Sequence, residues 1–259
     1  MKIAFAGKGG AGKTTLAAWM GDYLARSGRT VWMVDADTAL SLGQACGLSR
    51  SELPEPLAGR EDIVRERIGQ GCLRLNPEVS DIPEMLSRPL PLGGPPLPGA
   101  TAGEKRLLVM GLTPGAGGGC ACAANALLKA VLAHIICQRG EWVVVDLEAG
   151  VEHLGRGTIA HVDGLIVVSE PSLRSLEVAA ETGRLAGDLG LTRQMLVLNR
   201  CSGPTAPPLP GLAGLPDTVL TVPVLDTLRQ RQLDSGSVLG LPESSTIDRL
   251  CAAMAGLPA

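Results

Sequence analysis

The sequence has few aromatic residues and little excess charge of either sign. Only five of its 259 residues are aromatic, and 23 basic against 26 acidic side chains give a formal net charge of −3. Proteins that bind single-stranded nucleic acid stack bases on aromatic side chains, and proteins that bind duplexes concentrate Lys and Arg. We therefore expect no nucleic-acid partner.

Long hydrophobic runs are absent as well. No segment approaches the roughly 18 apolar residues of a membrane-spanning helix. The first six residues include Lys2 and pass directly into Gly-Lys-Gly-Gly, so we expect no secretory signal. We therefore expect a cytoplasmic protein without a membrane partner, in which thiols stay reduced. The seven cysteines cannot all pair within one chain, and a disulfide framework is not expected.

What the sequence does contain is an alternation of short apolar segments with helical patterns. Several segments are apolar throughout, as strands covered on both faces of a parallel sheet are. The predicted strands are 2–6, 30–34, 107–110, 142–145, 164–169, 195–198 and 218–222, and the predicted helices are 13–26, 121–137, 173–189 and 246–255. This order predicts an α/β fold with a single doubly wound, mostly parallel sheet flanked by helices, in one domain spanning residues 1–259.

Two segments rich in proline and glycine interrupt this alternation, at residues 89–103 and 202–216. Helices and strands are predicted on both sides of each segment. We therefore expect both to be surface loops of the same domain rather than linkers between domains.

Residues 7–14 read Gly-Lys-Gly-Gly-Ala-Gly-Lys-Thr and fit the phosphate-loop (P-loop) pattern G-x-x-x-x-G-K-[ST] at every fixed position. A predicted strand precedes the loop and a predicted helix follows it. In such loops backbone N–H groups cradle phosphates, the lysine contacts the β- and γ-phosphates, and the hydroxyl binds Mg²⁺. We therefore predict that ATP or ADP with Mg²⁺ is bound by Gly9, Gly10, Ala11, Gly12, Lys13, Thr14 and Thr15.

Acidic residues lie at the ends of two predicted strands, where a parallel sheet faces its ligand. Asp35 and Asp37 follow the second strand; they can serve Mg²⁺ or orient the attacking water, or they can cap the next helix. Asp146 ends a strand of three valines, as in a Walker B element, and is predicted to hold Mg²⁺. Residues 147–150, Leu-Glu-Ala-Gly, are a candidate switch segment.

Cys120 and Cys122 form a C-x-C pair between a run of glycines and a predicted helix. Two thiols at this spacing can point at one ion, and a helix N-terminus favours the thiolate that binds metal. One pair supplies only two ligands, whereas two facing copies of the chain would supply four. Core packing or a redox pair is the alternative, and core packing is the role expected of the other five cysteines.

Residues 8–15, Lys-Gly-Gly-Ala-Gly-Lys-Thr-Thr, resemble the deviant phosphate loop of the MinD/ParA/nitrogenase-iron-protein class of ATPases. Residues 119–128 and 146–158 narrow the resemblance to the CooC-type ATPases, which assist nickel insertion into carbon monoxide dehydrogenase. The resemblance covers nearly the whole chain. It is broken by the segment 89–103 and by Thr38, where many relatives have proline.

The resemblance implies further roles for individual residues. In that class the early lysine reaches the partner's nucleotide, so Lys8 implies a homodimer with ATP at the subunit interface. Asp37 would orient the attacking water, and Asn199, beside Arg200, would read the adenine base, which Pro223 would line. The catalytic set would be Lys8, Lys13, Asp37 and Asp146. Cys120 and Cys122 of both subunits would bind Ni²⁺ or Zn²⁺.

Three functions fit these motifs. The first is a homodimeric metal-binding ATPase that matures carbon monoxide dehydrogenase or a related nickel enzyme. A positioning ATPase of the MinD/ParA kind would need a basic C-terminal helix or a basic face, whereas residues 246–259 contain one Arg and one Asp. An iron–sulfur carrier of the same class is chemically feasible on four thiolates, but the C-x-C spacing fits it less well.

Overall fold

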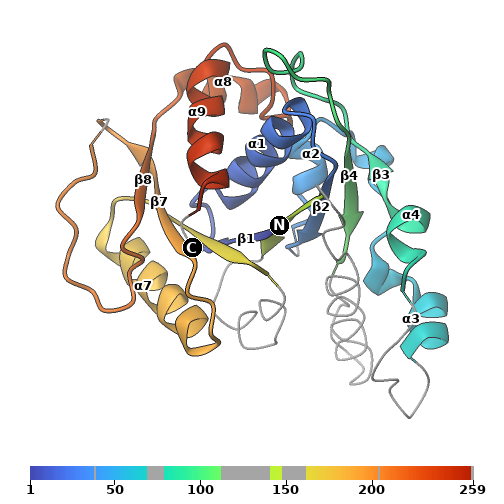
Figure 1. Ribbon diagram of the computed structural model, residues 1–259, viewed down its shortest axis with the longest axis horizontal. Helices are drawn as coiled ribbons and strands as arrows, with labels where there is room; N and C mark the ends of the chain where they lie inside the picture. The colour runs from blue at the N-terminus through green and yellow to red at the C-terminus, as the bar shows by residue number, and fades with distance from the viewer. Residues whose placement is uncertain (38, 69–78, 112–140, 148–161, 204, 258–259) are drawn as a thin grey trace.

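The computed structural model describes residues 1–37, 39–68, 79–111, 141–147, 162–203 and 205–257. The described residues form an eight-stranded sheet in the order β3-β4-β2-β5-β1-β6-β7-β8 (Figure 1). Every neighbouring pair is parallel except β3 and β4. The strands are β1 (Lys2–Gly7), β2 (Val31–Ala36), β3 (Arg88–Pro89), β4 (Lys105–Val109), β5 (Trp142–Leu147), β6 (Gly164–Ser169), β7 (Gln194–Cys201) and β8 (Val219–Pro223). The predicted doubly wound, mostly parallel sheet is therefore confirmed.

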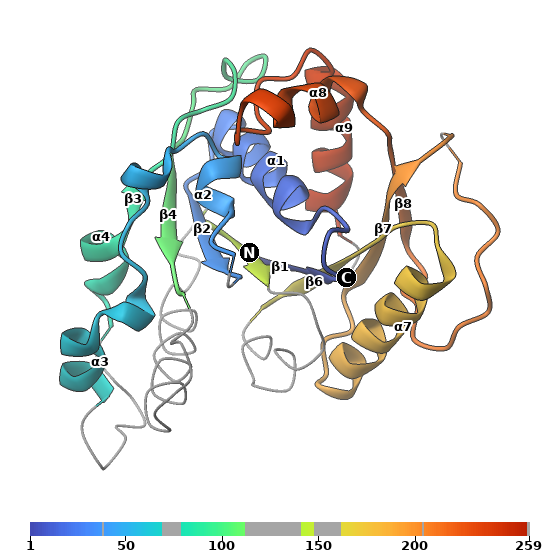
Figure 2. The same cartoon turned by 180° about the vertical axis from the view of Figure 1, so that it is seen from behind.

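Helices cover both faces of this sheet. The helices α1 (Lys13–Arg26) and α9 (Ser244–Ala255) lie on one face, and α7 (Leu173–Asp188) lies on the other (Figures 1 and 2). The remaining described helical segments are α2 (Leu42–Ala45), η1 (Arg50–Glu52), η2 (Leu57–Gly59), α3 (Glu61–Ile68), α4 (Ile82–Leu86) and α8 (Asp226–Asp234). None of these six was predicted, and the predicted helix 121–137 lies outside the described residues.

The central strand β1 shows why the strand segments are apolar throughout. Successive side chains of a strand point to opposite faces of the sheet. Ile3 and Phe5 pack with α1 and α9, whereas Ala4 and Ala6 pack on the face that α7 covers. All four are at most 1% exposed. Because both faces are buried, neither can carry polar side chains without cost.

The proline-rich segment 90–103 lies against the outer side of α1. The amides of Leu97 and Gly103 donate to the carbonyl oxygens of Arg26 and Ala25 at 2.9 and 2.8 Å. Pro89, directly before this segment, lies in β3, an antiparallel edge strand where a missing N–H is tolerated. The segment is therefore tied to the helix that follows the P-loop.

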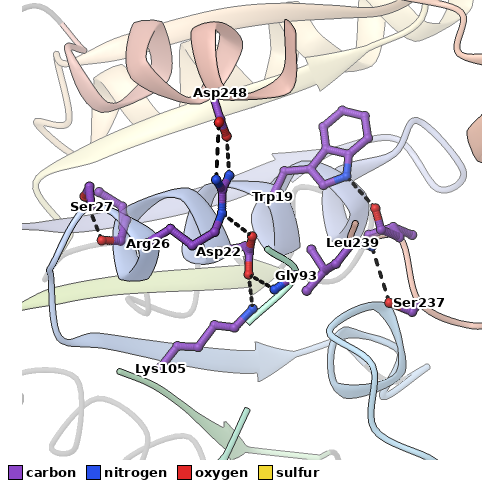
Figure 3. Close-up of polar contacts among 11 residues, drawn as sticks. Trp19, Asp22, Arg26, Ser27, Gly93, Lys105, Ser237, Leu239 and Asp248 are labelled. Carbon is purple, nitrogen blue, oxygen red and sulfur yellow. Dashed lines mark hydrogen bonds and ion pairs between the residues drawn. The ribbon is translucent and has the colours of Figure 1, made fainter. Parts of the chain in front are cut away.

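A cluster of buried charges holds the same helix (Figure 3). Asp22 Oδ1 accepts hydrogen bonds from Lys105 Nζ at 2.8 Å and from the amide of Gly93 at 2.7 Å. Asp22 Oδ2 accepts from Arg26 Nε at 2.8 Å, and the Arg26 guanidinium also pairs with Asp248 of α9. Buried charges are tolerated only when paired in this way. The cluster therefore joins α1 to β4, α9 and the segment 90–103.

Among the described helices, none has the length and apolar character that a bilayer crossing requires.

Candidate active site

The P-loop connects β1 to α1 at the carboxyl edge of the sheet. Gly7 and Gly12 have φ values of +136° and +104°, which side chains rarely adopt. A Cβ atom would lie 2.1 Å from the Val168 carbonyl oxygen at Gly7 and 2.2 Å from Asn199 Nδ2 at Gly12. The loop is therefore possible only with glycine at these two positions, and it opens toward solvent at Lys8, Gly9 and Gly10.

The two lysines of the loop differ in exposure. Lys13, in the first turn of α1, is only 5% exposed, whereas Lys8 is exposed. A buried lysine at a helix N-terminus adds positive charge to the N–H groups that end there. The start of α1 is therefore suited to hold a phosphate chain.

Thr14 and Asp146 meet directly beside this loop. Thr14 Oγ1 donates to Asp146 Oδ2 at 2.6 Å, and Ser41 Oγ lies 3.5 Å from Thr14 Oγ1. Asp146 Oδ1 is buried and has no hydrogen-bond partner within the described part of the chain. A carboxylate and two hydroxyls form an all-oxygen set that suits Mg²⁺, and the unsatisfied Oδ1 fits the ion or one of its waters.

Asp35 lies beside Asp146, because β2 and β5 place the two residues in register. Burial raises the pKa of each carboxyl from 3.8 to about 7. This value for Asp146 includes the raising effect of the neighbouring Asp35 charge and the lowering effects of the Thr14 hydrogen bond and Lys13. A bound cation would offset this cost of ionisation.

Asp35 and Asp37 have different local roles. Asp35 Oδ2 accepts the amide of Leu42 at 3.0 Å and so caps the start of α2, one of the roles that the sequence left open. Asp37 is partly exposed, and its Oδ1 accepts the amide of Ala39 at 2.8 Å. Leu40, with φ +48°, then turns the chain so that Ser41 faces Thr14. Asp37 is therefore left at the edge of the site.

A cavity of about 410 Å³ opens on the other side of the P-loop. The predicted residues that line it are Gly12, Thr15, Asn199, Arg200 and Pro223. Sequence reasoning missed its other lining residues, Trp19, Val224, Leu225, Leu228, Arg229 and Gln232. Its walls combine apolar side chains, which can contact a planar ligand, with polar groups that can fix the ligand's orientation.

Asn199 joins this cavity to the P-loop. Its Nδ2 donates to the Ala11 carbonyl oxygen at 2.7 Å, and its Oδ1 accepts the amide of Arg200 at 2.9 Å. Arg200 adopts φ +60°, where the pairing of β7 with β8 shifts register, and its guanidinium pairs with Glu170. The structure therefore brings the predicted nucleotide residues together on two sides of one loop.

Cys120 and Cys122 lie outside the described residues, as do Cys72 and Cys137. Cys46, Cys201 and Cys251 are buried free thiols, as expected for packing residues. Burial raises the pKa of Cys46 to about 12 and raises that of Cys251 as well.

Comparisons with known proteins agree with this geometry. The model of the CobQ/CobB/MinD/ParA nucleotide binding domain family matches residues 2–236. The carbon monoxide dehydrogenase accessory protein CooC of Rhodospirillum rubrum is 39% identical over 79% of this chain and 76% of its own. An uncharacterized ATP-binding protein of Methanocaldococcus jannaschii is 37% identical over 77% of this chain and 75% of its own.

Solved structures show the same fold. The cell division ATPase MinD of Pyrococcus furiosus superposes with a TM-score of 0.67 at 17% identity, and 99% of each chain is covered. MinD of Pyrococcus horikoshii, solved with Mg-ADP, gives a TM-score of 0.61 at 18% identity, covering 100% of this chain and 98% of its own. The family match and the CooC relative go further than the fold. The chain belongs to the CobQ/CobB/MinD/ParA nucleotide-binding family and is a CooC-like ATPase of the MinD/ParA class.

Proposed function

We propose that this protein is a nucleotide-dependent homodimeric ATPase that acts in the cytoplasm and helps to mature carbon monoxide dehydrogenase or a related nickel enzyme. The observation that carries the ATPase site is the contact of Thr14 with Asp146, whose second oxygen lacks a partner within the described residues. The client is inferred from the 39% identity to the CooC accessory protein.

In this proposal the P-loop amides of residues 9–12 and the Lys13 ammonium hold the phosphates of ATP. Thr14 and Asp146 hold Mg²⁺, with Ser41 nearby, and the ion would neutralise charge on the phosphate oxygens. The buried position of Lys13 and the 2.6 Å contact of Thr14 support this assignment.

Hydrolysis requires a water molecule in line with the bond between the β,γ-bridging oxygen and the γ-phosphorus. Asp37 is assigned the role of orienting that water, which its partial exposure at the edge of the site allows. The water oxygen bonds to the γ-phosphorus, the bridging oxygen leaves with ADP, and inorganic phosphate is released.

Lys8 connects the site to the dimer. Its side chain is exposed at the carboxyl edge of the sheet, whereas Lys13 is buried within the same loop. A lysine that projects outward can supply positive charge to the nucleotide of a second copy. In this proposal Lys8 acts across the interface, so each site is completed by the partner subunit.

The C-x-C pair would let the dimer bind a metal ion in addition to ATP. Cys120 and Cys122 from the two subunits would provide four thiolates for one Ni²⁺ or Zn²⁺ ion. ATP favours the closed dimer and hydrolysis loosens it, so nucleotide state would bias metal binding. The metal is cargo or a signal to the client, not part of the hydrolytic site.

The positioning ATPase remains an alternative that α9 does not favour. The apolar side chains of this helix, Ile247, Leu250, Cys251 and Met254, are buried against α1 and the sheet. An amphipathic membrane helix needs its apolar face free for lipid.

Measurement of dimerisation tests this proposal. Lys2 at the start of β1 and Lys8 directly after its end provide a matched pair of variants. Light scattering after gel filtration should show a monomer with ADP and a dimer with a non-hydrolysable ATP analogue and Mg²⁺. Lys8→Ala should prevent the shift, while the matched control Lys2→Ala should retain it. A monomer with the ATP analogue, or dimers in the Lys8→Ala variant, would contradict the proposal.

A further inference from the structure

The amide of Asn199 is already engaged on both sides. Its nitrogen donates to the carbonyl oxygen of Ala11, and its oxygen accepts the amide of Arg200. A carbonyl can only accept and a backbone N–H can only donate, so these two partners fix which way the side-chain amide points. Asn199 therefore uses one of its two N–H donors and one of its two oxygen lone pairs on its own chain, whereas a lining amide without such partners offers its full donor and acceptor capacity to a base.

Each of the two arginine side chains that line the cavity has an acidic neighbour. The Arg200 guanidinium is paired with Glu170, and Arg229 Nη1 lies 3.5 Å from Asp226 Oδ1. The side chain of Gln232 lines the same cavity and makes no hydrogen bond with any residue in the described ranges. Within the described lining, Gln232 is the side chain that offers an uncommitted donor and acceptor side by side.

The helix that carries Gln232 is fixed in place over the cavity. The Arg231 guanidinium donates to the carbonyl oxygens of Leu239 and Gly240, the latter at 3.2 Å. In the same segment, the Val238 carbonyl oxygen accepts a hydrogen bond from Trp19 Nε1 at 2.9 Å. Trp19 is 3% exposed and forms part of the cavity wall. The position of α8 is therefore tied to α1, the helix that begins at the P-loop.

We propose that Gln232 selects the adenine base and that Asn199 is a positioning residue which holds the P-loop for phosphate binding. This inference rests on the proposed placement of the nucleotide in the cavity. The amide of glutamine matches adenine, which presents an amino donor next to a ring acceptor, and mismatches guanine, which presents two acceptors at N7 and O6.

The role of Asn199 follows from its contact with the loop itself. Ala11 and Gly12 lie between the exposed part of the loop and α1, and the Asn199 amide occupies the space beside Gly12. Loss of the hydrogen bond to Ala11 would loosen the backbone that binds phosphates. Because every nucleotide carries those phosphates, loss of this hydrogen bond should weaken the binding of every nucleotide by the same factor.

Calorimetric titration with ADP and GDP in the presence of Mg²⁺ tests this division. Gln232→Ala should reduce the preference for ADP over GDP about fivefold or more, which corresponds to the ~1–3 kcal/mol of a bidentate contact. The matched control Gln230→Ala removes the same side chain from an exposed position of α8 outside the cavity, and it should leave the preference unchanged.

Asn199→Ala should weaken the binding of ADP and of GDP by the same factor. The ratio of the two dissociation constants should therefore stay unchanged. Asn199→Asp keeps an acceptor for Arg200 but faces Ala11 with an oxygen, so it should behave like Asn199→Ala and serves if that variant does not fold. The inference would be overturned if the preference for ADP over GDP were lost in the Asn199 variants and kept in Gln232→Ala. Wild-type protein that does not distinguish ADP from GDP would overturn it as well. Wild-type protein that binds neither would instead refute the proposed nucleotide site, and the inference with it.

Discussion

Thr14 Oγ1 donates a hydrogen bond of 2.6 Å to Asp146 Oδ2 and so joins the start of α1 to the end of β5. The two residues are 132 positions apart in the chain, yet they provide adjacent oxygen atoms beside the P-loop. Asp146 Oδ1 stays unsatisfied among the described residues. Thr14 and Asp146 therefore connect the helix that follows the P-loop to the sheet.

Removal of the Thr14 hydroxyl should weaken magnesium binding. Thr14→Ala takes away one of the proposed oxygen ligands, so the Mg²⁺ concentration that supports half-maximal ATP hydrolysis should rise at least ~10-fold. Thr14→Ser keeps the hydroxyl and should stay within a few-fold of wild type. An unchanged magnesium dependence in Thr14→Ala would exclude the assigned role.

The stability of the metal-free protein should fall as pH rises from about 4 to 7. The folded-state pKa values of Asp35 and Asp146 are raised to about 7, so the folded state holds protons that the unfolded state has released. Each carboxyl can account for up to about 4 kcal/mol over this range. Urea unfolding of wild type and Asp146→Asn across the range should show a shallower decline in the variant. Equal slopes would mean that Asp146 ionises in the folded state as it does in the unfolded state.

The buried charge cluster should be sensitive to the loss of one partner. Asp22→Asn leaves Lys105, whose side chain is fully buried, without its anionic partner, and this should cost about 3–5 kcal/mol of unfolding free energy. Asp188→Asn, which removes an exposed ion pair with Arg184, should cost far less. Denaturant-induced unfolding of both variants measures these losses of unfolding free energy. Similar losses in the two variants would show that Lys105 does not depend on Asp22 as its anionic partner.

Thiol titration should separate the cysteines into two groups. Cys46, Cys201 and Cys251 are buried with raised pKa values, so they should not react with Ellman's reagent in the native protein at pH 8. Of seven cysteines, at most four should therefore react before unfolding. Prior addition of Zn²⁺ and an ATP analogue should protect two of those four per chain. Five or more rapidly reacting thiols would contradict the burial.

Much of the fold and the phosphate side of the site could be predicted because the signals are local. The seven predicted strands are all present, with ends within three residues of the prediction, since strands buried on both faces are continuously apolar. The P-loop is one contiguous motif, and Asp146 directly follows its valine strand. Neither signal depends on residues far away in the sequence.

The parts that were missed depend on tertiary contacts. Ser41 reaches Thr14 only because Leu40 adopts a left-handed conformation, which leaves no clear trace in the sequence. Gln232 lies on α8, a polar helix with no buried residues and hence no apolar periodicity. Lys105 is charged yet fully buried by its pairing with Asp22, so hydropathy alone would place it at the surface. Strand β3 is two residues long, too short for any periodic pattern.

The central claim, that two copies of this chain share one metal ion under the control of ATP, is tested most directly by metal stoichiometry. Zn²⁺ and Ni²⁺ should be titrated into the protein with a non-hydrolysable ATP analogue, and the mass of the complex and its metal content should be measured together. The account predicts one ion per dimer, lost in Cys120→Ala and Cys122→Ala and retained in the buried control Cys251→Ala. One ion per monomer, or metal content unchanged in the Cys120 and Cys122 variants, would contradict it.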